Sequence, residues 1–90
     1  MDGRSDTFNI DKDMDLRGLS VNDVVDKTLK GLENVKDGNY LLVYINDYSQ
    51  IAEIAKAVVT KKATVDNVLK KNENDWLVMV KNEVPVAQAG

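Results

Sequence analysis

Six consecutive apolar or aromatic residues, YLLVYI at 40–45, lie between two segments of helical periodicity, and they limit the folds open to this chain more than any other feature. Turn residues bound the run on both sides, with KDGN at 36–39 before it and Asn46 and Asp47 after it. A run of this length is typical of a strand that is covered on both faces or lies centrally in its sheet. The sequence therefore predicts a central strand over residues 40–45.

Apolar residues recur at helical spacing on both sides of this strand, within residues 21–35 and 48–61. The first stripe comprises Val21, Val24, Val25, Thr28, Leu29, Leu32 and Val35, and the second comprises Ile51, Ile54, Ala55, Val58 and Val59. Charged residues lie outside the first stripe, as on a helix with one buried face. We expect two amphipathic helices over these ranges, with Val21 as the first core-facing residue of the first helix.

Alternating apolar residues predict three further strands. One falls within residues 8–16, most securely over 12–16. Two more lie on either side of NEND at 72–75 and form a closing hairpin. In the last strand the side chains alternate between two faces, with Trp76, Val78 and Val80 on one and Leu77 and Met79 on the other. The predicted order is β-α-β-α-β-β.

Two amphipathic helices need a common apolar surface, and a four-stranded mixed sheet with both helices on one face supplies it. We therefore predict an α/β two-layer sandwich. The 90 residues suffice for a single domain of this kind, with a folded core over about residues 8–81. The polar residues 1–7 and the tail 82–90, which contains Pro85, are expected to be loose.

The residue types that are missing exclude much catalytic chemistry. The chain has no Cys and no His, which removes disulfides, thiol and persulfide chemistry, imidazole acid–base catalysis and the usual soft metal ligands. Asp11, Asp13 and Asp15 alternate along the first strand and would share one sheet face, where they could meet a hard cation. No glycine-containing ligand loop follows them, so a solvated face is the favoured interpretation. We expect neither a metal site nor a cofactor.

The net charge of −3 provides no general attraction for a nucleic acid. DNA binding is not expected, and RNA binding would need a local basic patch, for which the candidates are the pairs Lys61–Lys62 and Lys70–Lys71. No segment approaches about 18 consecutive apolar residues, and the first residues lack the apolar core of a signal peptide. We therefore expect a cytoplasmic protein that does not associate with a membrane.

The segment DLRGLSVNDVV at 15–25 marks the entrance to the first helix. Ser20 is placed to cap the free amides of the first turn, and Asp23, three residues later, to bond back to the Ser20 amide. Gly18 is suited to a positive φ in the turn between strand and helix. For Arg17, an ion pair with Asp15 or Asp23 that orders the loop is favoured over binding of an anion or a partner carboxylate.

Two groups of residues carry a resemblance to a known family. The first is Asp15, Arg17 and Gly18 at this spacing, and the second, around the start of the second helix, is Asn46, Asp47, Glu53 and Ile54. With both groups the chain resembles the TusA-like (SirA-like) family of small sulfur-carrier proteins. The likeness covers nearly the whole folded region. In that family a strand ends in a D-x-R-G-x-x-C-P-x-P type motif. The resemblance implies that the motif's Cys accepts sulfane sulfur as a persulfide from a cysteine desulfurase or rhodanese-like donor and passes it along a relay.

The chain departs from the family at the chemistry. Val21 occupies the position of the family's Cys, while Asn22 and Val24 replace the two prolines of the motif. The loss of both prolines favours natural divergence over an engineered replacement of one residue. Valine has no nucleophilic atom, and Ser20 has no His to activate it. The resemblance therefore implies a protein that is not an enzyme and carries no sulfur itself.

What remains is a binding function. The resemblance implies that the docking surface of the carriers is retained at Arg17, Gly18, Ser20, Val21, Asn22, Asp23 and Asp47. Its partner would be a cysteine desulfurase, a rhodanese-like protein or another sulfur-relay protein.

Two other functions remain open. The first is a self-associating structural or assembly module that pairs through the edge of the strand at 76–80 to form a homo-oligomer. The second is RNA binding, by analogy with the similar α/β layout of the C-terminal domain of bacterial translation initiation factor 3. Tyr40 and Tyr44 fall on one strand face, and they and Trp76 are expected to pack in the core rather than form a stacking platform.

Overall fold

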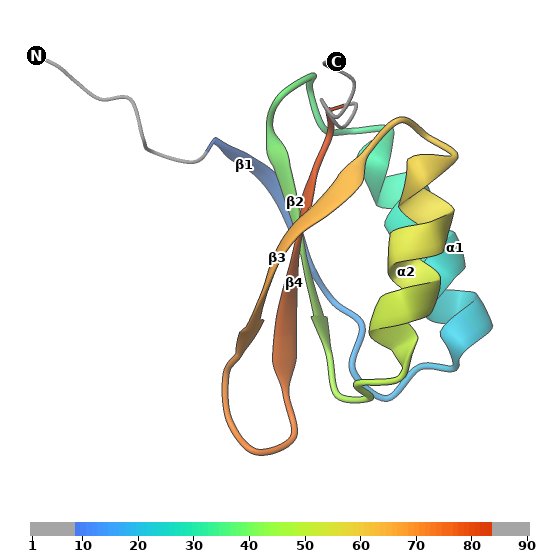
Figure 1. Cartoon of the computed structure of the whole chain (residues 1–90), viewed down its shortest axis with the longest axis vertical. Coiled ribbons are helices and arrows are strands. Elements are labelled where there is room, and N and C mark those ends of the chain that lie inside the picture. The colour runs from blue at the N-terminus through green and yellow to red at the C-terminus, as the bar shows by residue number, and fades with distance from the viewer. Residues whose placement is uncertain (1–8, 84–90) are drawn as a thin grey trace, which may run out of the picture.

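Two helices cover one face of a four-stranded sheet in the computed structural model, which describes residues 9–83 (Figure 1). The elements follow one another as β1 (Ile10–Asp15), α1 (Val21–Leu32), β2 (Tyr40–Ile45), α2 (Gln50–Val59), β3 (Thr64–Lys70) and β4 (Trp76–Lys81). The predicted element order and the α/β two-layer sandwich are thus confirmed. The predictions for Phe8, for residues 1–7 and for residues 84–90, including Pro85, lie outside the described residues.

The strands lie side by side in the order β1-β2-β4-β3. β1 pairs with β2 in parallel, and β4 is antiparallel to both β2 and β3. β2 is therefore internal, as its unbroken apolar run predicts. β4 is internal as well, so the predicted self-association through the edge of residues 76–80 is wrong: both edges of that strand are already paired. The edges of the sheet are β1 and β3.

The main core lies between the sheet and the helices. The strands contribute Leu41, Val43, Ile45, Val78 and Val80, and the helices contribute Val24, Ile54 and Val58, all fully buried. Thr28 is also fully buried, and its hydroxyl donates to the Val24 carbonyl oxygen at 2.7 Å. Because that donor is satisfied within the helix, its burial carries little penalty.

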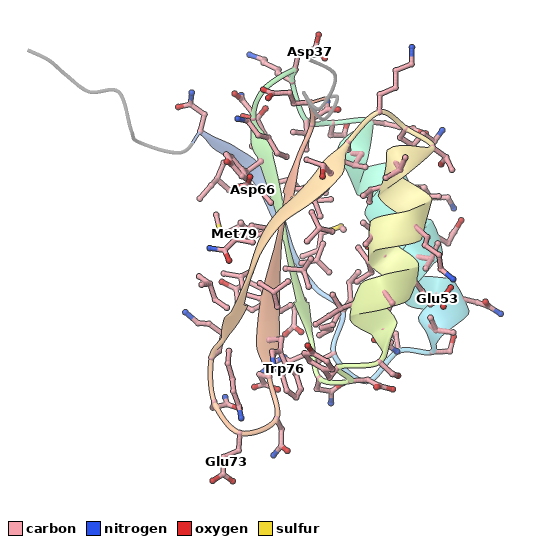
Figure 2. The ribbon with its side chains drawn as sticks, in the orientation of Figure 1. Asp37, Glu53, Asp66, Glu73, Trp76 and Met79 are labelled. Atoms are coloured by element: carbon pink, nitrogen blue, oxygen red, sulfur yellow. The ribbon has the colours of Figure 1, made fainter. Side chains whose placement is uncertain are left out.

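The opposite face of the sheet carries a second, smaller apolar cluster formed by Tyr40, Leu42, Leu77 and Met79, with Tyr44 packed against it. Figure 2 shows Met79 and Asp66 on this side, away from the helices. The Tyr40 hydroxyl donates to the Asp66 carboxylate at 2.9 Å. Burial of the phenol and this bond both raise the pKa of Tyr40. The predicted alternation of the last strand is confirmed, as is the shared face of Tyr40 and Tyr44.

Both helices are shorter than the ranges predicted for them, 21–35 and 48–61. α1 ends at Leu32 rather than at residue 35, because the amide of Val35 donates to the Leu32 carbonyl oxygen in a tighter turn that still buries the valine. α2 begins at Gln50 rather than at residue 48, since Asp47 accepts hydrogen bonds from the backbone and hydroxyl of Ser49. In α1 the apolar periodicity thus continues into the turn that follows the helix.

The end of α2 contains a left-handed residue, Lys62, with φ of 61°. Its amide donates to the Val59 carbonyl oxygen, and the Ala63 amide donates to that of Val58, which is the double bond of a Schellman motif. Glycine usually occupies this position because a Cβ is strained there.

Lys62→Gly should therefore stabilise the fold by about 1 kcal/mol, because relief of left-handed strain outweighs the greater entropy of glycine in the unfolded chain. The measurement is the shift of the urea unfolding midpoint at constant slope. Lys61→Gly is the matched control, because Lys61 precedes the left-handed position, and it should destabilise the chain slightly. Equal effects of the two substitutions would contradict the assignment of strain to Lys62.

Candidate functional site

The candidate site lies at the end of the molecule where β1 and β2 finish and both helices begin (Figure 1). Three loops meet the solvent there, namely residues 16–20, 46–49 and 71–75. Because β1 and β2 are parallel, their carboxyl ends share one edge of the sheet. In open α/β sheets, ligands usually bind outside the carboxyl ends of the strands.

Arg17 links two of these loops. Its Nε and Nη2 donate to the two carboxylate oxygens of Asp15 at 2.8 and 2.7 Å, and its Nη1 donates to Asp75 at 3.0 Å. The predicted pair with Asp15 is confirmed, but the second partner is Asp75 rather than Asp23. Asp75 lies 58 residues away in sequence, so no local pattern points to it. These bonds raise the pKa of Arg17 and commit its guanidinium to carboxylates of the same chain.

The same contact predicts a measurable titration. Side-chain and backbone hydrogen bonds from Arg17 lower the pKa of Asp15 to about 2. Since the folded pKa lies below the unfolded value, the bond contributes stability above about pH 4, and this contribution is lost as the pH falls toward 2. Arg17→Gln should move the Asp15 midpoint back toward 3.8, observed by ¹³C NMR of the carboxyl carbon. Lys71→Gln is the control, and a midpoint that stays at about 2 in Arg17→Gln would exclude the guanidinium as the cause.

The loop at 16–20 is also tied to the start of α2. Gly18 adopts a φ of 84°, as predicted, and its amide donates to the Asn46 side-chain oxygen at 2.9 Å. Gln50 is buried, and its Nε2 donates to the Leu19 carbonyl oxygen at 3.0 Å. Sequence reasoning missed Gln50, although a glutamine on the apolar side of a predicted helix is the kind of signal that marks such a bond.

The predicted N-cap is confirmed, because the Ser20 Oγ accepts a hydrogen bond from the Asp23 amide at 3.3 Å. Val21 begins α1, but 37% of it is exposed and it does not belong to the core. The prediction that Val21 faces the core is therefore wrong: the buried side of α1 begins one turn later, at Val24. Asn22 and Asp23 are exposed beside it.

Two aromatic side chains, one from the loop at 46–49 and one from the start of β4, meet at the same end. The rings of Tyr48 and Trp76 lie with their centroids 5.4 Å apart, and the Lys70 ammonium lies 5.9 Å from the Trp76 ring centroid. Figure 2 shows Trp76 beside the start of α2. Trp76 is half-buried against the main core, as predicted, whereas Tyr48 is largely exposed. Asp47 acts locally, through its bonds to Ser49.

A cleft of about 380 Å³ opens beside Arg17 on the face away from the helices, and its polar lining includes Asp13, Asp15, Tyr44, Lys71 and Asp75. None of the side chains that line this cleft is a cysteine or a histidine.

The three aspartates of β1 do not act together. Asp13 and Asp15 border this cleft, but Asp11 accepts hydrogen bonds from the Lys36 amide and the Asn39 side chain. A register irregularity between Ile10 and Lys12 accounts for the difference, so the prediction that all three share one face is wrong. Among residues 9–83, no group of three metal-ligating side chains is placed to hold an ion.

The two lysine pairs do not form one patch. Lys61 and Lys62 precede β3, whereas Lys70 and Lys71 lie at its far end. Lys70 is directed to Trp76. Neither helix in residues 9–83 has the length and hydrophobicity needed to cross a bilayer.

Comparison with known proteins supports the fold. No family model and no curated protein matches the chain. The solution structure of HP1264 from Helicobacter pylori is similar, with a TM-score of 0.55 and 17% sequence identity over 80% of this chain and 97% of that chain. At this identity the likeness establishes a shared fold and nothing about activity.

Proposed function

We propose that this chain is a non-catalytic relative of the TusA-like sulfur carriers, which binds a protein in or near a sulfur-transfer pathway without carrying persulfide itself. The entrance surface, defined as Arg17, Gly18, Ser20, Val21, Asn22, Asp23 and Asp47, is the proposed contact. A cysteine desulfurase, a rhodanese-like protein or another relay protein is the proposed partner.

The observation that carries the proposal is the setting of Val21. It is an exposed apolar side chain at the first position of a helix, where the family's reactive residue stands. Hydrogen bonds fix the loop before it: Arg17 donates to Asp15 and Asp75, and the Gly18 amide donates to Asn46. A rigid loop that presents an apolar group loses little conformational entropy on binding, which favours its use as a docking surface.

A direct binding titration tests the proposal. A labelled full-length chain is titrated with a purified cysteine desulfurase and, separately, with a rhodanese, in the presence and absence of a thiol-bearing TusA-like competitor. Val21→Arg should abolish binding because a charge replaces the apolar contact. Val59→Arg is the matched control, since Val59 is 56% exposed at the last position of α2. Binding that the competitor does not displace, or that both variants weaken equally, would contradict the proposal.

An affinity capture from extract of the source cell, with mass spectrometry of the retained proteins, selects which relay protein to titrate. The double variant Val21→Arg, Asp23→Arg serves as the negative control there. Retention of relay proteins by the parent and by the double variant alike would argue against the entrance surface.

Self-association is the second candidate function, and one observation favours it. β3 is an edge strand, and Leu69 on it is 41% exposed. Edge strands with apolar side chains are templates for pairing with another chain. Sedimentation at rising concentration tests this idea, with Leu69→Lys as the disrupting variant, and a strict monomer would eliminate it. RNA binding is the third candidate and would require strongly salt-dependent affinity.

A further inference from the structure

A groove of about 250 Å³ runs between β1 and α1, on the side of the sheet that the helices cover. It is lined by Lys12, Met14, Lys27, Lys30, Gly31 and Asn34. Three of its side chains are cationic and none is a carboxylate, although the whole chain has a charge of −3. The groove is therefore a local reversal of the protein's overall charge.

The shape of the groove floor depends on Gly31, which has no side chain. Gly31 lies in the last turn of α1, and a Cβ placed on it would come within 2.9 Å of the Met14 Cε. The helix therefore approaches β1 closely, with the methionine beneath it. Lys27 and Lys30 are three residues apart, so they lie on adjoining positions of the same helix side. Lys30 also pairs with Asp26 at 3.2 Å, but both side chains are well exposed and such a pair is weak.

The strand beside these lysines is an edge of the sheet. Leu16 donates its amide hydrogen to the Tyr44 carbonyl oxygen, so Lys12 and Met14, which share its parity, also direct their backbone groups to β2. Asp13 and Asp15 then direct their N–H and C=O groups outward. Within residues 9–83 no strand pairs with this side of β1. Their side chains border the cleft on the opposite face.

We propose that the β1 edge and the lysine groove together bind an extended segment of a partner protein that has acidic residues at every second position. Successive side chains of an added strand point to opposite faces of the sheet. The acidic residues of the segment would point to the helix side and meet Lys12, Lys27 and Lys30. The residues between them would point to the other face, beside Asp13, where neutral or basic side chains are favoured. The groove lies apart from the entrance surface, so this proposal goes beyond the function proposed above.

A peptide is favoured over a nucleic acid by two features of this edge. The outward N–H and C=O groups of Asp13 and Asp15 alternate as donor and acceptor, which another peptide backbone satisfies and a sugar–phosphate backbone does not. The carboxylates of the same two residues lie on the other face of this edge strand, and they would repel a phosphate backbone that ran along the edge.

The test uses the full-length ¹⁵N-labelled protein and two fluorescent peptides of identical composition. One alternates Glu and Thr over eight residues, and the other has all its Glu residues in one block. The alternating peptide should bind more tightly, shift the amide signals of Asp13 and Asp15, and slow the hydrogen exchange of both amides. Equal affinities, or shifts that leave the β1 amides unchanged, would show that charge alone is recognised and would overturn the proposal.

Two pairs of variants locate the contact. Lys27→Glu with Lys30→Glu should weaken binding of the alternating peptide about tenfold or more. Lys56→Glu with Lys61→Glu changes the net charge equally at exposed positions elsewhere, and it should leave the affinity almost unchanged. Asp13→Pro removes the outward amide, a loss that an edge strand tolerates, together with the carboxylate. It should also abolish binding, whereas Asp13→Ala, which removes the carboxylate alone, should not, and circular dichroism confirms that both variants fold. Displacement of the peptide by inorganic phosphate or by polyuridylate at lower concentration than by unlabelled peptide would overturn the proposal in favour of a phosphate site.

Discussion

Val21→Cys is expected to convert a chain that has no thiol into one that accepts sulfane sulfur. The introduced side chain would stand at the first residue of α1, at a position that is 37% exposed in the native chain. Free amides and the helix dipole at this position lower a thiol pKa below its ordinary value of about 8.5. The thiolate would attack the outer sulfur of a donor persulfide, form the new S–S bond and release the donor thiolate.

Two readouts separate the chemistry from the docking. Ultraviolet absorbance of the thiolate reports the pKa without any partner, and mass spectrometry after incubation with a cysteine desulfurase and cysteine reports the gain of one sulfur atom. Val59→Cys is the matched control, because it places an exposed thiol at the last residue of α2, where the dipole disfavours a thiolate. Equal pKa values would contradict the role of the helix entrance, whereas a lowered pKa without preferential sulfur uptake would contradict the proposed docking.

Leu41→Ala is the second substitution with a large expected effect. Leu41 is fully buried at the centre of the main core, between the sheet and the helices. Loss of its transfer free energy and the cavity left behind should lower the free energy of unfolding by about 3–5 kcal/mol. Small domains have a total of only about 5–15 kcal/mol, so a large part of the population would unfold on mild heating. Urea unfolding measures the loss.

Leu42→Ala removes the same atoms from the adjacent residue on the other face. Leu42 belongs to the smaller cluster and is slightly exposed, so its loss should cost about 2 kcal/mol, near the lower end of the range for such substitutions. The comparison isolates the effect of the helical layer because residue type, strand and position are almost the same. Equal losses would mean that the two faces of β2 are equally well packed.

The elements of this fold were predictable because each depends on a pattern within one segment. The apolar run of β2 and the two helical stripes identify themselves by period alone. The place of β4 between β2 and β3 was not predictable in the same way. It depends on which strands pair across long stretches of chain, and the misassigned edge at residues 76–80 follows from that.

The same distinction between local and long-range contacts applies to the candidate site. The Asp15–Arg17 pair, the positive φ of Gly18 and the Ser20 cap involve residues at most three positions apart, and all are confirmed. Asp75 and Asn46 reach the site from other loops, and Gln50 reaches it from the start of α2. No local pattern identifies the partners of these three side chains. Val21 was misplaced because a helical stripe gives the direction of a side chain, not whether the sheet extends far enough to cover it.

The strand order has a consequence for folding during synthesis on the ribosome. β4 is synthesised after β1, β2 and β3, yet it occupies an internal position and supplies partners to both β2 and β3. A nascent chain that stops before residue 76 therefore holds β3 with no neighbour and β2 with one side unpaired. The sheet cannot close until residues 76–81 have been synthesised, and long-range pairing of this kind is slow. Until then the unfinished sheet exposes apolar strands that chaperones recognise.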